Sequence, residues 1–169
     1  MEIKVTELKK CLKAVDKDSS ELDSLVFDVI LPFSSDLDDY VRFVSRLLKN
    51  GENPPTNAEL EDCCLNLSTL IYFASGACET LGVRDDVSKV GYKEAYHATR
   101  ASLDSGTVAD KDSIAELNSR TEMLTNMCYN RAYKLMKSKV DTAQELLASC
   151  KKVLSHRMLE MELTRMEVN

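Results

Sequence analysis

Residues that form turns are scarce in this sequence. It has 5 glycines and 3 prolines in 169 residues, and it has no tryptophan. An all-β sandwich or barrel needs turn residues about every 8 to 12 positions, so these counts exclude that class. From Thr107 to Asn169 there is neither glycine nor proline, a run of 63 residues. We therefore expect an all-α fold, a multi-helix subunit with long C-terminal helices that oligomerises through helix packing.

Long apolar runs are also missing. The longest uncharged stretch, Cys63 to Cys78, has 16 residues and contains several polar side chains, so it is too short and too polar to span a membrane. The opening Met1-Glu2-Ile3-Lys4 lacks the apolar segment of a signal peptide. Six cysteines without an export signal predict reduced thiols in the cytoplasm, which is the host cytoplasm if the protein is viral. No CxxC or CxxxC pair occurs, so we expect neither a metal site nor a cofactor.

Breaks in the helical pattern divide the N-terminal residues 1–52 into predicted segments. Residues 3–15 have helical spacing, and the polar run 16–20 is expected to end that helix. Residues 22–31 fit either a helix or a short strand, and Pro32 is expected to end either one. A further helix begins near Ser35 and closes at Gly51. The linker 53–55 then separates an acidic N-terminal helical region, residues 1–52, from a helical core, residues 56–169, which is expected to oligomerise.

The core is predicted to contain three or four helices. Thr56 and Glu59 have the spacing of a capping box. The helix that follows is expected to stop at Gly82, and its apolar stripe is Leu60, Cys64, Leu67, Ile71, Ala74, Cys78 and Leu81. A helix over about 85–102 comes next, and residues 108–166 are either one long helix or two with a new start at Asp141. The last of these has a near-heptad stripe suited to packing within or between subunits: Val140, Ala143, Leu147, Cys150, Leu154, Met158 and Met161.

Charge is distributed unevenly along the chain. The formal net charge is −6, which taken alone argues against a nucleic-acid partner. Residues 16–62 carry a net −8, however, whereas residues 89–157 carry a net +4. An acidic front and a basic back predict that a polyanion binds the second part and that the first part repels or regulates it.

The basic part has a helical pattern. Lys89, Lys93, Tyr96 and Arg100 fall at steps of 4, 3 and 4, with Tyr92 beside them. Cations that follow phosphates and rings that stack on unpaired bases are what single-stranded nucleic acid needs. A second group, with Tyr129 and Tyr133 nearby, consists of Arg131, Lys134, Lys137 and Lys139. The alternative for both groups is a solvated helix face with tyrosines packed in the core.

No group of residues predicts catalysis. The acidic group Glu59, Glu61 and Asp62 is similar to half of the magnesium-binding ExxE pairs of all-helical nucleotide pyrophosphohydrolases, but a second pair is missing. Carboxylates at a helix start are also explained by the helix dipole. His156 and Glu160 form an i, i+4 pair that is better explained as a surface contact. Every cysteine except Cys63 falls on an apolar stripe, as expected for small core residues.

The segment Lys93-Glu94-Ala95-Tyr96-His97-Ala98-Thr99-Arg100, with Ser105-Gly106 after it, resembles the DNA-contacting segment of the UvsY family, the recombination mediators of T-even phages. That segment is a basic helix followed by Ser-Gly. The resemblance continues through Glu122-Met123 to Leu146-Leu147-Ala148-Ser149-Cys150 and Leu154, and it covers about residues 93–157.

This resemblance implies a fold and a function. Members of the family are all-helical homo-oligomeric rings, hexamers or heptamers, that bind single-stranded DNA. They help to load a RecA-like recombinase onto strands covered by single-strand-binding protein. Arg100 matches the family arginine and Lys93 a basic residue one helical face earlier, whereas Ala98 stands where the family has a second cation.

Three hypotheses follow for the function. The first is a non-enzymatic mediator that binds single-stranded DNA through Lys89, Tyr92, Lys93, Tyr96, Arg100, Arg131, Lys134 and Lys137. The second is a helical structural or adaptor protein of a viral or cellular assembly that binds no nucleic acid. The third is a helical hydrolase of nucleotides that uses the acidic group at residues 59–62.

Overall fold

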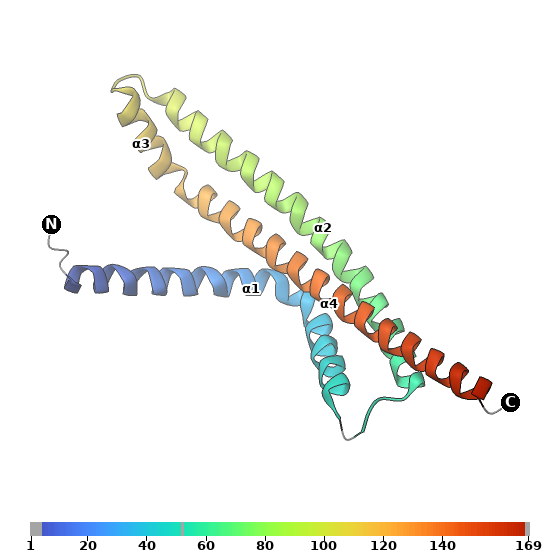
Figure 1. Ribbon diagram of the computed structural model, residues 1–169. Helices are drawn as coiled ribbons and strands as arrows, with labels where there is room; N and C mark the ends of the chain where they lie inside the picture. Colours follow the sequence, from blue (N-terminus) through green and yellow to red (C-terminus); the bar gives the residue numbers. More distant parts are fainter. Residues whose placement is uncertain (1–4, 52, 168–169) are drawn as a thin grey trace. The chain divides into compact units, whose positions relative to one another are not determined.

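The protein consists of long helices joined by short turns. The computed structural model describes residues 5–51 and 53–167, and over these ranges it holds four helices and no strand. They are α1 (Val5–Lys49), α2 (Asn57–Ser102), α3 (Val108–Asn118) and α4 (Arg120–Glu167) (Figure 1). The predicted all-α class with a long C-terminal helix is confirmed.

The chain packs as two units that share three of its helices. The first unit comprises Met1–Pro32 and Thr80–Lys134, and the second comprises Phe33–Glu79 and Leu135–Asn169. Helices α1, α2 and α4 each contribute one part to each unit, and α3 belongs to the first. The boundary expected between residues 1–52 and 56–169 stays a prediction. Each of the two units contains segments from before and from after that boundary.

Apolar stripes on three helix segments form the core of the second unit. The predicted stripe on α2 is correct at every position in this unit but one: Cys63 is buried at 2% exposure, and Cys64 lies at the edge of the core. Cys63 is therefore a core residue, contrary to expectation. The other buried apolar side chains of this unit are Leu37, Val44, Leu60, Leu67, Ile71, Ala74, Cys78, Met136, Val140, Ala143 and Cys150.

The stripe on α4 is buried only along part of its length. Ala143 and Cys150 are fully buried, and Leu147 and Leu154 are half-buried. Beyond them, the last turns carry exposed apolar side chains. These are Met158, Leu159, Met161, Leu163 and Met166, each about half exposed or more. The end of the predicted seam is thus uncovered within the described part of the chain.

The first unit has a smaller core and a close contact between two helices. Val26 and Ile30 of α1, Leu81 of α2 and Ala115 of α3 are buried in it. Gly82, expected to stop a helix, lies inside α2. A Cβ atom at this position would lie 3.3 Å from Cε2 of Tyr133, so the missing side chain lets the tyrosine ring of α4 pack against the backbone of α2.

Two predicted breaks in α1 are absent. The polar run 16–20 continues the helix, with the hydroxyls of Ser19 and Ser20 bonded to backbone carbonyls one turn earlier. Pro32 also lies inside α1, where it removes one helical hydrogen bond. Burial of Ile30 before it and of Leu37 after it offsets that loss. The prediction that Pro32 ends the segment was wrong, and residues 22–31 are helical.

The other helix ends follow local capping. Thr56 and Glu59 form the predicted capping box, in which the Thr56 N–H lies 2.6 Å from Glu59 Oε2 and the Glu59 N–H lies 3.2 Å from Thr56 Oγ1. Gly51 follows the end of α1 as expected. Its backbone lacks a positive φ, however, and Gly106, in the turn before α3, is the described residue that has one (107°).

Residues 108–166 form two helices, and the break lies at Ser119 instead of Asp141. Thr107 and Asp110 build a second capping box at the start of α3. The hydroxyl of Ser119 donates to the Ala115 carbonyl at 2.7 Å, and its carbonyl accepts from the Met123 N–H at 3.0 Å. Asp141 lies within the continuous α4.

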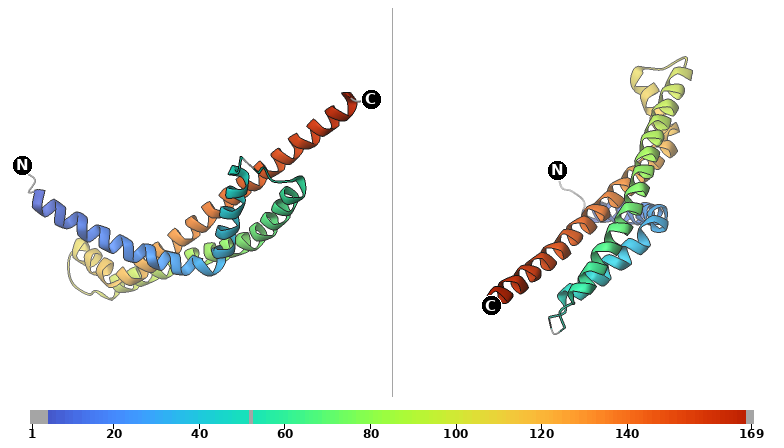
Figure 2. Two further views of the ribbon diagram at one scale, coloured as in Figure 1. Left: turned by 90° about the horizontal axis from the view of Figure 1, so that it is seen from below. Right: turned by 90° about the vertical axis from the view of Figure 1, so that its right-hand side faces the viewer.

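A polar cluster sets the register of α2 against α4 in the first unit, where Figures 1 and 2 agree that the two helices lie side by side and antiparallel. The side chain of Asn126 donates to Asp85 Oδ1 at 3.1 Å and to Ser88 Oγ at 3.1 Å. Asn130 donates to Asp85 Oδ2 at 2.9 Å. Both carboxylate oxygens of Asp85 are thus bonded across the interface. Because Asn126 and Asn130 are one turn apart on α4, a one-turn slip would leave at most one of them opposite Asp85.

We expect Asn126→Ala to destabilise the protein by about 1–3 kcal/mol, because it leaves the half-buried Asp85 carboxylate short of a donor. Urea unfolding measured by circular dichroism checks this value. The matched control is Asn118→Ala, at an exposed position, with an expected change within about 0.5 kcal/mol. Equal effects of the two substitutions would contradict a role for Asn126 in setting the register.

Candidate nucleic-acid interface

The predicted basic stripe lies along one edge of α2 in the first unit. Lys89, Lys93 and Arg100 are exposed, whereas Tyr92 and Tyr96 are half-buried. All five belong to the C-terminal half of one uninterrupted helix, so their spacing is held by the backbone of α2. The structure thus brings these five predicted residues together.

Asp112 of α3 holds two members of the stripe. One of its oxygens, Oδ1, accepts from the Tyr96 hydroxyl at 3.0 Å and lies 2.6 Å from Nε of Arg100. The hydrogen bond to Asp112 is the main cause of the raised pKa of Tyr96, which ionises less readily beside a carboxylate. Arg100 therefore has a local counterion, and its charge is only partly available to a phosphate.

Aromatic rings follow the same edge. The Tyr92 and Tyr96 centroids are 6.5 Å apart, and the Tyr96 ring meets the imidazole of His97 edge-on at 5.4 Å. His97 is exposed, although the sequence pattern did not connect it with the stripe.

A hollow of about 430 Å³ lies between the end of α2 and the start of α3. Its basic lining comes from His97, Arg100 and Lys111, and Ala101 and Val108 complete it. Lys111 donates to the backbone carbonyl of Leu103, which ties α3 to the turn before it. Lys111 and Asp112 were missed by sequence reasoning because they approach the stripe only after the chain turns at residues 103–107.

The second basic group is not gathered with the first. Arg131 and Lys134 are exposed on the part of α4 in the first unit, and Arg131 lies 3.9 Å from Asp23 of α1. The α2–α4 register puts Lys134 about 12 residues, or roughly 18 Å, along the helix axis from the level of Lys93. Lys137 is exposed but belongs to the second unit, so nothing places it beside the stripe.

The acidic group at residues 59–62 has a structural explanation. The Glu59 carboxylate accepts from the backbone and hydroxyl of Thr56, and these bonds lower the pKa of Glu59. Among the residues that the structure describes, no three His, Cys, Asp or Glu side chains are placed to bind a metal ion. His156 forms the surface contact predicted for it, 3.3 Å from Glu160.

Three thiols lie close enough in the second unit to influence one another: Cys63, Cys64 and Cys150. Burial raises the pKa of each of these thiols, and that of Cys150 reaches about 11, with further contributions from Cys64 and Cys63. The nearby Tyr40 hydroxyl offsets part of the rise in the pKa of Cys63. Thiols held protonated are poor nucleophiles, which favours a packing role for this cluster.

The raised pKa of Cys150 predicts alkaline destabilisation. The thiol ionises near pH 8.5 in the unfolded chain and near 11 in the folded one, so folding stability is full below about pH 8.5 and falls as the pH rises toward 11. The loss attributable to this group is on the order of 3 kcal/mol. Urea unfolding of wild type and Cys150→Ala between pH 8 and about 11 measures it. The variant should lose less stability over this range, whereas the exposed Cys11→Ala control should follow wild type; parallel curves for wild type and Cys150→Ala would refute the prediction.

No helix in the described part of the chain combines the length and the hydropathy that a membrane crossing requires. Comparison of the chain with protein-family models, curated proteins and solved structures finds no match to any of them.

Proposed function

We propose that this protein is a non-enzymatic, homo-oligomeric mediator of recombination that binds single-stranded DNA and helps to load a RecA-like recombinase onto it. The observation that carries the proposal is the stripe on α2, where three exposed cations alternate with two half-exposed rings on one rigid helix. Charges spaced along a helix follow a phosphate backbone, and rings beside them stack on unpaired bases. The basic hollow beside Arg100 extends this surface toward α3.

Binding by one subunit is weak in this proposal. Asp112 neutralises part of Arg100, and the whole chain carries a net charge of −6. Several copies along one strand multiply weak contacts, so oligomerisation is part of the proposed mechanism. The exposed apolar end of α4 is a suitable seam, since its side chains lack cover within the described residues. The single-strand-binding protein and the recombinase enter through the resemblance described above.

The stripe predicts salt-dependent binding. If Lys89, Lys93 and Arg100 each displace a counterion, the slope of log K against log salt is about −2 per subunit. Fluorescence anisotropy of a labelled oligothymidylate, titrated with protein at several salt concentrations, measures it. The double substitution Lys93→Ala and Arg100→Ala should reduce the slope to about −0.7, since one of the three cations remains. Circular dichroism should show unchanged helicity.

The matched control removes two exposed cations elsewhere, Arg46→Ala with Lys49→Ala at the end of α1. It should retain the wild-type slope. Absence of salt-sensitive binding by the wild-type protein would refute the DNA-binding proposal. An equal loss of oligonucleotide binding in both double variants would mean that the stripe is not the DNA-binding surface.

Asp112 provides a test in the opposite direction. Asp112→Asn keeps the size of the side chain and an acceptor for the Tyr96 hydroxyl, but it removes the counterion of Arg100. We expect tighter binding of the oligonucleotide by roughly threefold to tenfold, because the charge of Arg100 is then fully available to a phosphate. The pKa of Tyr96 should also fall, which ultraviolet titration of tyrosinate detects. Unchanged affinity would mean that Arg100 does not contact DNA.

A helical adaptor without nucleic-acid binding is the alternative function. It is favoured by the large apolar side chains exposed on the described helices, including Tyr72 and Phe73 on α2 at 75% and 67%. Exposed apolar surface of this kind marks protein contacts. Light scattering after size-exclusion chromatography, with and without oligonucleotide, distinguishes the two functions because only the mediator changes mass when the oligonucleotide is added.

A further inference from the structure

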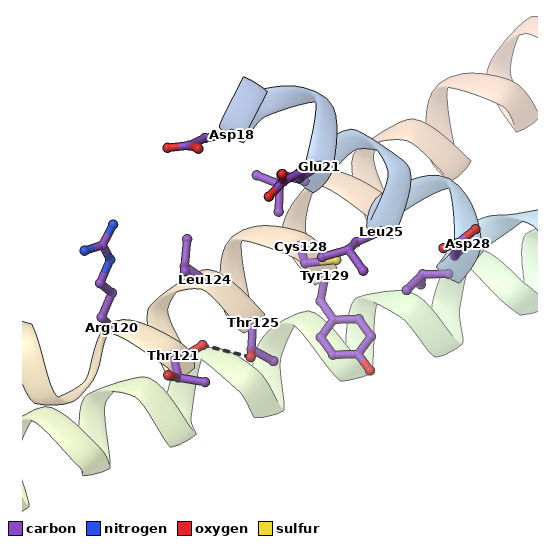
Figure 3. A pocket seen from close by; sticks show the side chains of 12 residues that line it. Asp18, Glu21, Leu25, Asp28, Arg120, Thr121, Leu124, Thr125, Cys128 and Tyr129 are labelled. Carbon is purple, nitrogen blue, oxygen red and sulfur yellow. Dashed lines mark hydrogen bonds between the residues drawn. The ribbon is translucent and has the colours of Figure 1, made fainter. Parts of the chain in front are cut away.

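An apolar groove with an acidic rim runs between α1 and α4 in the first unit (Figure 3). Its volume is about 750 Å³. Leu22, Leu25 and Val29 line the α1 wall, and Leu124 and Cys128 line the α4 wall. Leu25 and Leu124 are 57% and 43% exposed, so this apolar lining faces solvent.

The rim of the groove is negative. Asp18, Glu21 and Asp28 stand along its α1 side, and Arg120 stands at one end (Figure 3). From residue 18 to residue 41 the sequence has no lysine or arginine. A partner with an apolar face and basic flanks would therefore satisfy both the lining and the rim.

The chain itself carries a segment of that kind. Residues 9–17 of α1, here called the basic arm, have lysines at positions 9, 10, 13 and 17 and the apolar side chains Leu12 and Val15. All of these residues are exposed, Leu12 at 54% and Val15 at 63%. Leu12 and Val15 have the i, i+3 spacing that puts both on one face of the helix, as in an amphipathic helix that enters a groove.

The basic arm cannot reach the groove of its own chain. It is the same uninterrupted helix as the α1 wall, and only a few residues separate Val15 from Asp18. A helix does not fold back on itself without a break, and none is present between residues 5 and 29. The occupant with matching chemistry must therefore come from a second copy.

We propose that the basic arm of one chain docks in the acidic groove of a second copy, and that the basic arm of the second copy docks in the groove of the first. Two α1 helices then run antiparallel, so that the basic half of each faces the acidic half of the other. The basic arm is about 14 Å long and the α1 wall from Asp18 to Val29 about 18 Å, so the arm fits within the length of the wall. A reciprocal contact of this kind is isologous and closes as a dimer.

In this arrangement the arm becomes a third helix between α1 and α4 of its partner. Leu12 and Val15 cover Leu25, Leu22 and Leu124, which removes apolar surface from water on both copies. Lys9, Lys10 and Lys13 of the arm meet Asp18 and Asp28 at the rim, together with Glu21, which lies 3.8 Å from Lys17 of its own chain. This contact is independent of DNA binding and of the seam suggested for the end of α4.

Thiol crosslinking tests the contact directly. Cys11 lies on the exposed arm and Cys128 lines the groove. A short bismaleimide reagent should join Cys11 of one copy to Cys128 of the other and give a covalent dimer on a denaturing gel. Cys11→Ser and Cys128→Ser should each abolish the product, and an equimolar mixture of the two variants should restore it. A wild-type protein that yields no Cys11–Cys128 dimer overturns the proposal.

Charge reversal tests the complementarity. Lys10→Glu with Lys13→Glu changes the arm, and Glu21→Lys with Asp28→Lys changes the rim; all four positions are exposed. Sedimentation velocity at several protein concentrations should show at least a tenfold weaker self-association for each double variant. A mixture of the two should recover it, because every contact then pairs opposite charges.

The control, Arg46→Glu with Lys49→Glu, reverses two exposed cations at the other end of α1 and should associate as wild type does. Leu25→Asp changes an exposed apolar position of the groove and leaves the lysines of the arm unaltered. It should also weaken self-association. If the wild-type protein is monomeric, if the mixture stays dissociated, or if the control behaves like the arm variant, the groove does not receive the arm.

Discussion

The pairing of Asp85 with Asn126 and Asn130 is the constraint on which the first unit depends. It fixes the height of α4 beside α2, and with that height the Tyr133 ring meets the bare backbone at Gly82. The same register determines where the chain returns from the turn after α2. The start of α3 therefore lies where Asp112 reaches Tyr96 and Arg100. A purely apolar interface between two long helices permits slippage by a turn, whereas here such a slip would leave one carboxylate oxygen of Asp85 without its asparagine.

Much of the fold follows from local sequence signals. The shortage of glycine and proline predicts helices, the periodicity of α2 predicts its buried face, and Thr56 with Glu59 predicts a helix start. The errors have a common physical cause. Pro32 and Gly82 oppose a helix locally, yet packing on either side keeps the helix continuous. Cys63 and Cys64 differ by one position on the helix, and only the neighbouring helices decide which of the two is buried.

The candidate site, like the fold, is only partly predictable from the sequence. The stripe of Lys89, Lys93 and Arg100 is visible in the sequence because one helix holds it. The contact that restrains it is not visible, since Asp112 follows the turn and belongs to another helix. Arg131 likewise has an unforeseen partner, Asp23, which is more than a hundred residues away in the sequence. Periodicity reports which residues share a face, but it carries no information about the charge that packs opposite that face.

The uncovered end of α4 has a chemical consequence. Three of its exposed apolar side chains, Met158, Met161 and Met166, are thioethers in contact with solvent. Oxidation to sulfoxides makes such side chains polar and lowers the free energy gained by burying them. Any assembly that uses this end of the helix is therefore weakened by oxidants and recovers under methionine sulfoxide reduction, while the buried Met136 in the core of the second unit is protected.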